Sequence, residues 1–168
     1  MPKKALLVID VDHGDGWKPE QIQNEPSRQL VAKNIKTELA RWRANNGLIV
    51  FVMFGANTAL AEFLEHRHDN VNEPAFVKTE IDAFTNEKLA EYLQGQGVTE
   101  VVLAGCQTFC CVKATAFGAV NAGFSVTLLR DLVFHPFDKQ YDAEERWLDY
   151  IKGIIKMNPD SKLSAKIE

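Results

Sequence analysis

Short apolar runs rich in β-branched residues alternate along this chain with longer stretches of helical periodicity. Runs of this kind are typical of parallel strands that helices cover on both faces. The sequence therefore predicts an α/β fold, a three-layer α/β/α sandwich around a mostly parallel, doubly wound sheet. The predicted strands span residues 5–10, 48–54, 76–78, 100–104 and 125–129.

Apolar side chains recur at helical spacing between these strands. The pattern is found at residues 30–42 and 89–93, and a stop signal containing glycine follows each stretch. Residues 112–122 and 143–157 carry the same pattern, so we predict two further helices there. The alternation of strand and helix thus extends along nearly the whole chain.

Three segments carry neither pattern and are rich in Gly, Asn, His, Pro or charge. They span residues 11–26, 55–74 and 131–141. Because each follows a predicted strand, we expect each at the carboxyl edge of the sheet, where an open α/β fold builds its binding site.

Length and composition limit the number of domains and the class of partner. A chain of 168 residues with 46% hydrophobic residues forms one domain, residues 1–168. The net charge is -4 without a basic run, which excludes nucleic acid as a partner. No apolar run approaches the roughly 20 residues of a membrane span. Three clustered cysteines, at positions 106, 110 and 111, indicate free thiols in a reducing compartment, and we predict a cytoplasmic protein.

Asp10 and Cys111 each follow a buried strand and are the strongest candidates for chemistry. Asp10 closes the run of residues 5–9, and Cys111 comes shortly after residues 101–104. In a doubly wound sheet the two strands are expected to be neighbours, so both side chains would face the crevice at the switch point. The start of a helix near Cys111 predicts a thiolate, because the helix N-terminus favours negative charge.

Lys78 ends another short strand and completes a set of groups suited to acyl transfer. Asp10 can accept the thiol proton of Cys111 and return it to a leaving amine, while Lys78 stabilises negative charge. The backbone N–H groups of Gln107 and Cys111 are a candidate oxyanion hole. Spacing alone leaves other readings open: Asp10 as a helix cap, Lys78 as a solvated side chain, and the cysteines as core packing.

The segment from Gly105 to Ala116 contains the pattern Gly-x-x-Thr-x-x-Cys-Val. With the run of residues 6–10 and with Lys78-Thr79, it resembles the isochorismatase-like hydrolases, a family that includes nicotinamidases and N-carbamoylsarcosine amidases. The resemblance implies a catalytic triad of Asp10, Lys78 and Cys111, a sheet of five to six strands, and a homo-oligomer. It also implies a cis peptide bond after Gly105, between Cys106 and Gln107.

The sequence departs from the family in the segments expected at the entrance of the substrate pocket. Residues 12–17 differ from the family's usual segment after the first strand, and residues 54–57 stand where nicotinamidases carry metal-binding Asp-x-His. His66 and His68 lie further on, where a solvated helix end is the simpler reading. We therefore predict no metal and no cofactor.

The sequence thus predicts a cysteine hydrolase that acts on a small amide, carbamoyl or ureido C–N bond. Trp17, Phe109 and Phe134 are candidate walls of the substrate pocket, with core packing as the alternative. Two other functions remain open. One is a non-catalytic or redox-sensing protein that uses the clustered thiols, and the other is a metal-assisted nicotinamidase that uses Asp12, His13, His66 or His68.

Overall fold

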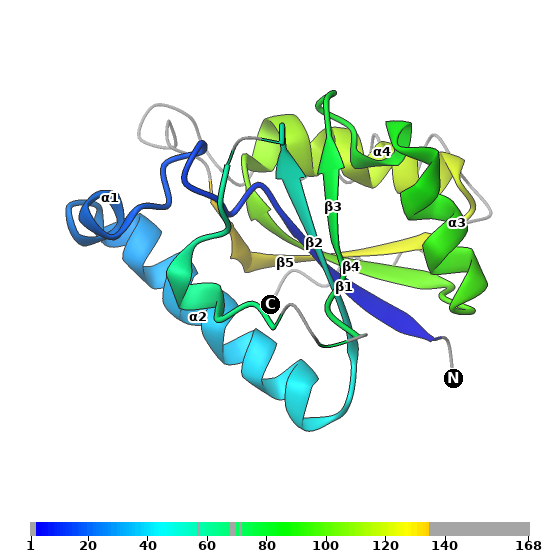
Figure 1. Cartoon of the computed structure of the whole chain (residues 1–168), viewed down its shortest axis with the longest axis horizontal. Helices are drawn as coiled ribbons and strands as arrows, with labels where there is room; N and C mark the ends of the chain where they lie inside the picture. Colours follow the sequence, from blue (N-terminus) through cyan, green and yellow to red (C-terminus); the bar gives the residue numbers. More distant parts are fainter. Residues whose placement is uncertain (1–2, 57, 68–69, 71, 135–168) are drawn as a thin grey trace.

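The computed structural model describes residues 3–56, 58–67, 70 and 72–134. Five parallel strands form one sheet in the order β3-β2-β1-β4-β5. The sheet is sandwiched between helices, with α2 on one face and α3 and α4 on the other (Figure 1). The predicted three-layer α/β fold is therefore confirmed. The strands are β1 (Lys4–Ile9), β2 (Leu48–Phe54), β3 (Ala75–Lys78), β4 (Glu100–Cys106) and β5 (Ser125–Phe134).

The central strand β1 separates two hydrophobic cores. Leu7 and Ile9 belong to the core beneath α3 and α4, whereas Leu6 and Val8 belong to the core beneath α2. This division follows from the alternation of side chains along a strand. All four are fully buried, and burial of such a side chain is worth about 1.5 to 3 kcal/mol.

The helices follow from apolar spacing and from the residues at their ends. They are α1 (Pro19–Gln23), α2 (Pro26–Ala44), α3 (Glu87–Gly95) and α4 (Lys113–Asn121). In α2, Ile35 and Leu39 lie four residues apart on the buried face. The Asn86 side chain caps α3 by accepting the N–H of Lys88. None of the helices that the structure describes is long and apolar enough to span a membrane.

Two expectations from the sequence were wrong in detail. Strand β5 continues to Phe134, five residues beyond its predicted end, although residues 131–141 were expected to be irregular. A register shift opposite Leu103 and Gly105 accommodates the exposed Arg130 and Asp131, after which Val133 and Phe134 pair again with β4. Helix α1 lies within a segment predicted to be irregular, because it has no buried residue that would mark it. The helix predicted over 143–157 lies outside the described residues.

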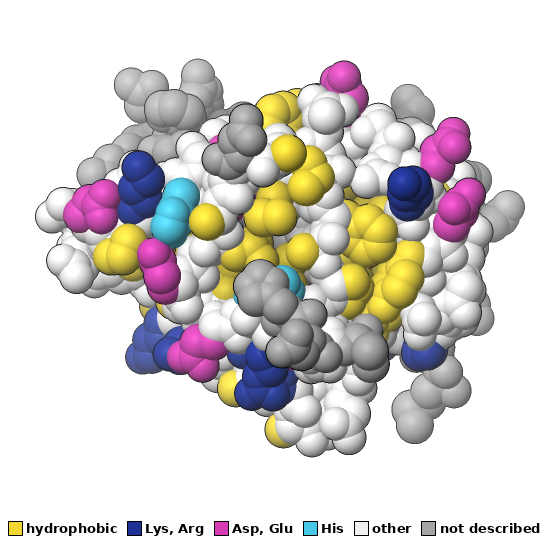
Figure 2. All heavy atoms as spheres, viewed as in Figure 1, with side chains coloured by type: hydrophobic (Ala, Val, Ile, Leu, Met, Phe, Trp, Pro, Cys, Tyr) yellow, Lys and Arg dark blue, Asp and Glu magenta, His cyan; other side chains and the backbone are white. Residues whose placement is uncertain are grey.

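Hydrophobic side chains gather on the face over β2 and β3 (Figure 2). Among the exposed large hydrophobic residues are Phe54, Val77 and Ile81, which lie at or just beyond the ends of β2 and β3. The homo-oligomer implied by the family resemblance stays a prediction.

Candidate active site

Asp10 and Lys78 form an ion pair at the carboxyl edge of the sheet. Lys78 Nζ lies 2.9 Å from Asp10 Oδ2, and both side chains are fully buried. Asp10 directly follows β1 and Lys78 ends β3, which lies beyond β2 in the sheet. A carboxylate that is removed from water needs such a partner, so the pair accounts for the burial of both charges.

The Lys78 ammonium is held by several groups at once. It donates hydrogen bonds to the carbonyl oxygens of Glu80 at 3.2 Å and Ile81 at 3.4 Å. It also lies 4.6 Å from the centre of the Phe54 ring, where a cation is attracted to the aromatic face. With the contact to Asp10, these partners fix the ammonium in one position.

Cys111 reaches the same edge through a sharp turn after β4. The peptide bond between Cys106 and Gln107 is cis, as the sequence resemblance implied. A π-helical turn, Thr108–Val112, then leads into α4, so Cys111 lies in this turn and just before the helix. The Gln107 carbonyl accepts hydrogen bonds from the N–H groups of Cys110 and Val112, which holds the turn.

Two glycines allow the close packing that places this turn. Gly105 has φ +121, and a Cβ built on it would lie 2.0 Å from the Ile9 carbonyl oxygen in the neighbouring strand. In α4, a Cβ on Gly118 would lie 2.2 Å from Asp82 Oδ1. Because Thr115 Oγ1 also accepts the Ala83 N–H, the segment after Lys78 is fastened to the helix that follows Cys111.

The Cys111 thiol interacts with the Asp10 carboxylate. Burial raises the pKa of Cys111 to about 12, and the hydrogen-bonding interaction and the charge of Asp10 act in the same direction, whereas Lys78 lowers it. Burial also raises the pKa of Asp10, against the lowering effects of Lys78 and Cys111. The expectation of a resting thiolate was therefore wrong: half a charge at a helix terminus is outweighed by burial beside a carboxylate.

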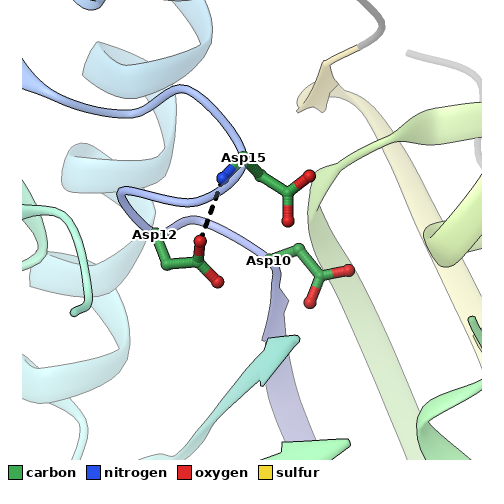
Figure 3. Close-up of side chains that lie close together, drawn as sticks. All are labelled: Asp10, Asp12 and Asp15. Atoms are coloured by element: carbon green, nitrogen blue, oxygen red, sulfur yellow. Dashed lines mark hydrogen bonds between the residues drawn. The ribbon is translucent and has the colours of Figure 1, made fainter. Parts of the chain in front are cut away.

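Two further carboxylates lie beside Asp10 on the loop after β1. Asp10, Asp12 and Asp15 each present an oxygen, and these oxygens all lie within 4.8 Å of one another (Figure 3). Asp12 Oδ1 accepts hydrogen bonds from the N–H groups of Gly14 and Asp15 and from the Thr58 hydroxyl. These bonds explain why the loop folds back and brings Asp15 toward Asp10.

Asp15 is half-buried, and the charges around its carboxyl group shift its pKa. Burial raises the pKa of Asp15 to about 6, and the negative charges of Asp10 and Asp12 raise it further, while Lys78 and Arg28 oppose the shift. From the sequence, Asp12 was a candidate only for the metal-assisted alternative, and Asp15 had no predicted role. Two aspartates within five residues of Asp10 were the signal that could have singled them out.

The three aromatic candidates for pocket walls lie in different places. Trp17 and Phe134 are buried and contact each other edge to face, with ring centres 5.5 Å apart, on the side of the sheet that α2 covers. The Arg28 guanidinium lies 5.0 Å from the Trp17 ring and 4.2 Å from the Phe134 ring. Phe109 is half-buried against the other core. Their contact with substrate stays a prediction.

Of the other two cysteines, Cys106 is more deeply buried than Cys111, and Cys110 is half-buried as Cys111 is. Cys106 is buried at the end of β4, and burial raises its pKa well above the ordinary range of a thiol. Cys110 is half-buried in the same turn as Cys111. Burial makes Cys106 a packing residue.

A solved structure supports the fold and raises the question of a metal. The pyrazinamidase of Pyrococcus horikoshii in complex with zinc is 26% identical to this chain, with a TM-score of 0.69. The match covers 91% of this chain and 96% of that chain.

The described residues do not offer a comparable zinc site. His66 Nε2 lies 2.8 Å from the Glu73 carbonyl oxygen, and the His66 ring packs against Phe51. His13 pairs with Glu62 at 3.1 Å, and His68 lies outside the described residues. Among the described residues, only the three aspartates group as metal donors, and a site made of carboxylates alone suits Mg²⁺, Mn²⁺ or Ca²⁺ better than zinc.

Two curated relatives extend the comparison. Maleamate amidohydrolase of Pseudomonas putida is 39% identical over 102 residues, which are 61% of this chain and 48% of that protein. Streptothricin hydrolase of Streptomyces noursei is 30% identical over 140 residues, 77% of this chain and 54% of that protein. The chain thus spans about half the length of these two relatives.

A family model decides the classification. The isochorismatase domain matches residues 4–148, which include every strand of the described sheet and the residues Asp10, Lys78 and Cys111. The chain therefore belongs to the isochorismatase family.

Proposed function

We propose that this chain is a cysteine hydrolase that cleaves a small amide, carbamoyl or ureido C–N bond through a covalent intermediate on Cys111. The observation that carries the proposal is the buried ion pair between Asp10 and Lys78, with the Cys111 thiol against the same carboxylate. A cation, a base and a nucleophile in one water-poor place are the parts that acyl transfer requires. The names of the two relatives, an amidohydrolase and a hydrolase, support the same reaction class.

The first half of the reaction forms the covalent intermediate. Because the resting thiol is protonated, Asp10 takes the proton as Cys111 Sγ attacks the carbonyl carbon. The carbonyl oxygen becomes an oxyanion that accepts hydrogen bonds from the N–H groups of Gln107 and Cys111. Each such donor typically lowers the activation barrier by roughly 3 to 4 kcal/mol. Asp10 then gives its proton to the nitrogen, the C–N bond breaks, and the amine or ammonia leaves.

The second half of the reaction restores the thiol. A water molecule gives a proton to Asp10 as its oxygen attacks the thioester or thiocarbamate carbon. The C–S bond breaks, the sulfur takes the proton back from Asp10, and the acid product leaves. Throughout, Lys78 holds Asp10 in place and offsets the negative charge that passes between carboxylate, sulfur and oxyanion.

A screen of small amides and ureas tests the proposal, with release of ammonia or amine as the readout. The wild-type protein is compared with Cys111→Ala and Asp10→Asn, and Cys110→Ser serves as the matched thiol control. We expect a loss of about a thousandfold or more in both site variants and activity close to wild type in the control. Turnover that persists in Cys111→Ala would refute the proposal. An acyl adduct on the peptide that contains Cys111 would support it directly.

Several properties expected from the sequence stay proposals beside this one. They are the cytoplasmic location, self-association, and a small molecule as the only partner besides a second copy of the chain. The proposed chemistry uses neither a cofactor nor a metal.

A further inference from the structure

The loop after β1 adds negative charge to a site that already contains a buried carboxylate. Figure 3 shows the Asp12 carboxylate directed toward Asp10, and the carboxylates of Asp10 and Asp15 directed to the same side. Their oxygens lie within 4.8 Å of one another. A ligand group that enters beside Cys111 therefore meets up to three carboxylates at once.

Three oxygens of this group have no hydrogen-bond donor among the described residues: both oxygens of Asp10, which faces Lys78 and Cys111, and Oδ2 of Asp12. Asp12 is fully buried, and its Oδ1 accepts three hydrogen bonds, but its Oδ2 is buried without a hydrogen-bond partner. Buried carboxylate oxygens are nearly always bonded, because each unbonded one has lost its water without replacement. An N–H or O–H group of a bound ligand would supply the donor that Asp12 Oδ2 lacks among the described residues.

The nearby cations offset only part of this charge, because Lys78 is paired with one of the three carboxylates, Asp10, and Arg28 is paired with Glu25. Lys78 is engaged by Asp10 and by two backbone carbonyl groups. The Arg28 guanidinium pairs with Glu25 at 3.1 Å and donates to the Asp15 carbonyl oxygen at 3.2 Å, so it holds the loop backbone. A negatively charged ligand would be repelled here, whereas a positively charged one would be attracted.

We propose that the site selects amides that carry a cationic nitrogen group, such as an ammonium, amidinium or guanidinium, next to the scissile bond. Asp15 is the specificity residue, because it is half-buried and therefore the most accessible of the three carboxylates, since Asp10 and Asp12 are fully buried. The Asp12 Oδ2 atom accepts an N–H of the same group. This inference rests on the proposed hydrolase function and names its substrate class.

Thiol-modifying reagents that differ only in charge test the inference without a known substrate. Three methanethiosulfonates are used, with a trimethylammonioethyl, a sulfonatoethyl and a methyl group. In each reaction the Cys111 sulfur attacks the reagent's divalent sulfur, a mixed disulfide forms, and methanesulfinate leaves with the electron pair. The rate at Cys111 is followed by peptide mass, which separates it from Cys110, and is divided by the rate at glutathione.

We expect the normalised ratio of cationic to anionic rates to be well above one in the wild type. Asp15→Asn should lower this ratio by about tenfold or more, because the lost charge acts on both reagents in opposite directions. Glu91→Gln removes one exposed charge from α3 and should leave the ratio within about twofold. The neutral reagent controls for access and folding, and Asp15→Ser is the second variant if Asp15→Asn does not fold.

A ratio near one, or a ratio that Asp15→Asn and Asp15→Ser leave unchanged, would overturn the inference. A ratio that millimolar Ca²⁺ or Mn²⁺ abolishes, at matched ionic strength, would assign the carboxylates to a metal ion and would also overturn it. The proposed function is judged separately, by whether amide hydrolysis depends on Cys111. Hydrolysis without charge preference would therefore leave that proposal standing.

Discussion

Removal of the Lys78 ammonium should destabilise the protein strongly, because Asp10 would remain buried without its counter-ion. In Lys78→Met the volume of the side chain is largely kept, so the change isolates the charge. Both side chains are fully buried and 2.9 Å apart, and removal of one partner from such a pair costs about 3 to 5 kcal/mol. With a urea m-value of about 2 kcal/mol/M, the midpoint of unfolding at neutral pH should fall by about 1.5 to 2.5 M.

The pH dependence of this loss has a definite sign. Burial already raises the pKa of Asp10, and without Lys78 it rises further. A carboxyl group with a raised pKa in the folded state contributes stability at low pH that is lost as the pH rises. The destabilisation by Lys78→Met should therefore be greatest at neutral pH and shrink as the solution is acidified toward the unfolded pKa, near 3.8.

A double-mutant cycle completes the test. Asp10→Asn removes the charge that Lys78→Met leaves unpaired, so the double variant should recover most of the lost free energy of unfolding. A loss below about 1 kcal/mol in Lys78→Met, or a double variant no more stable than Lys78→Met, would refute the reasoning from burial.

Three further predictions follow from the site. Gly105→Ala should fail to fold or lose about 3 kcal/mol or more in chemical denaturation, since its Cβ would lie 2.0 Å from the Ile9 carbonyl oxygen; a variant of normal stability would contradict the close approach. The rate of iodoacetamide labelling of Cys111 should still increase with pH above pH 9, because the pKa of its thiol is about 12. Asp10→Asn should increase the labelling rate at pH 8, because Asp10 raises that pKa. Slower labelling in this variant would contradict the assignment. As the pH rises from 4 to 6, the free energy of unfolding of the wild type should fall relative to that of Asp15→Asn. The reason is that the pKa of Asp15 is raised from 3.8 to about 6 in the folded state, so the folded protein keeps a proton that the unfolded chain has already released. Urea-unfolding free energies that change in parallel with pH in the two proteins would count against this prediction.

Strands β1, β2 and β4 were predictable because most of their residues are apolar and buried. The predicted end of β5 was wrong, because two exposed charged residues at 130 and 131 look like the start of a loop. Only pairing with β4 across a register shift shows that the strand continues. A local pattern contains no information about such a partner, which comes from another part of the sheet.

The proximity of the three candidate residues was predictable from the sequence, but their electrostatics only partly so. Asp10, Lys78 and Cys111 were identified in advance, and the structure brings them together. The pKa of Cys111 was misjudged because burial depends on the whole fold. The approach of Asp15 to Asp10 depends on the turn that Asp12 organises with Thr58, 46 residues further along the chain. No periodicity or spacing encodes that contact.

The hydrogen bonds of the loop after β1 connect it to residues 59–61. Val11 and His13 are tied to Ala61 and Ala59 by backbone bonds, and Asp12 bridges to Leu60. The helix that follows the turn with Cys111 is bonded instead to the segment after Lys78. Residues 11–16 and 58–61 therefore form one hydrogen-bonded unit that could be replaced as a whole. If both segments are transferred together from one family member to another, we expect the substrate preference to change while the reaction stays the same. Substitutions in these two segments would then allow new substrates without changes in the residues proposed for catalysis.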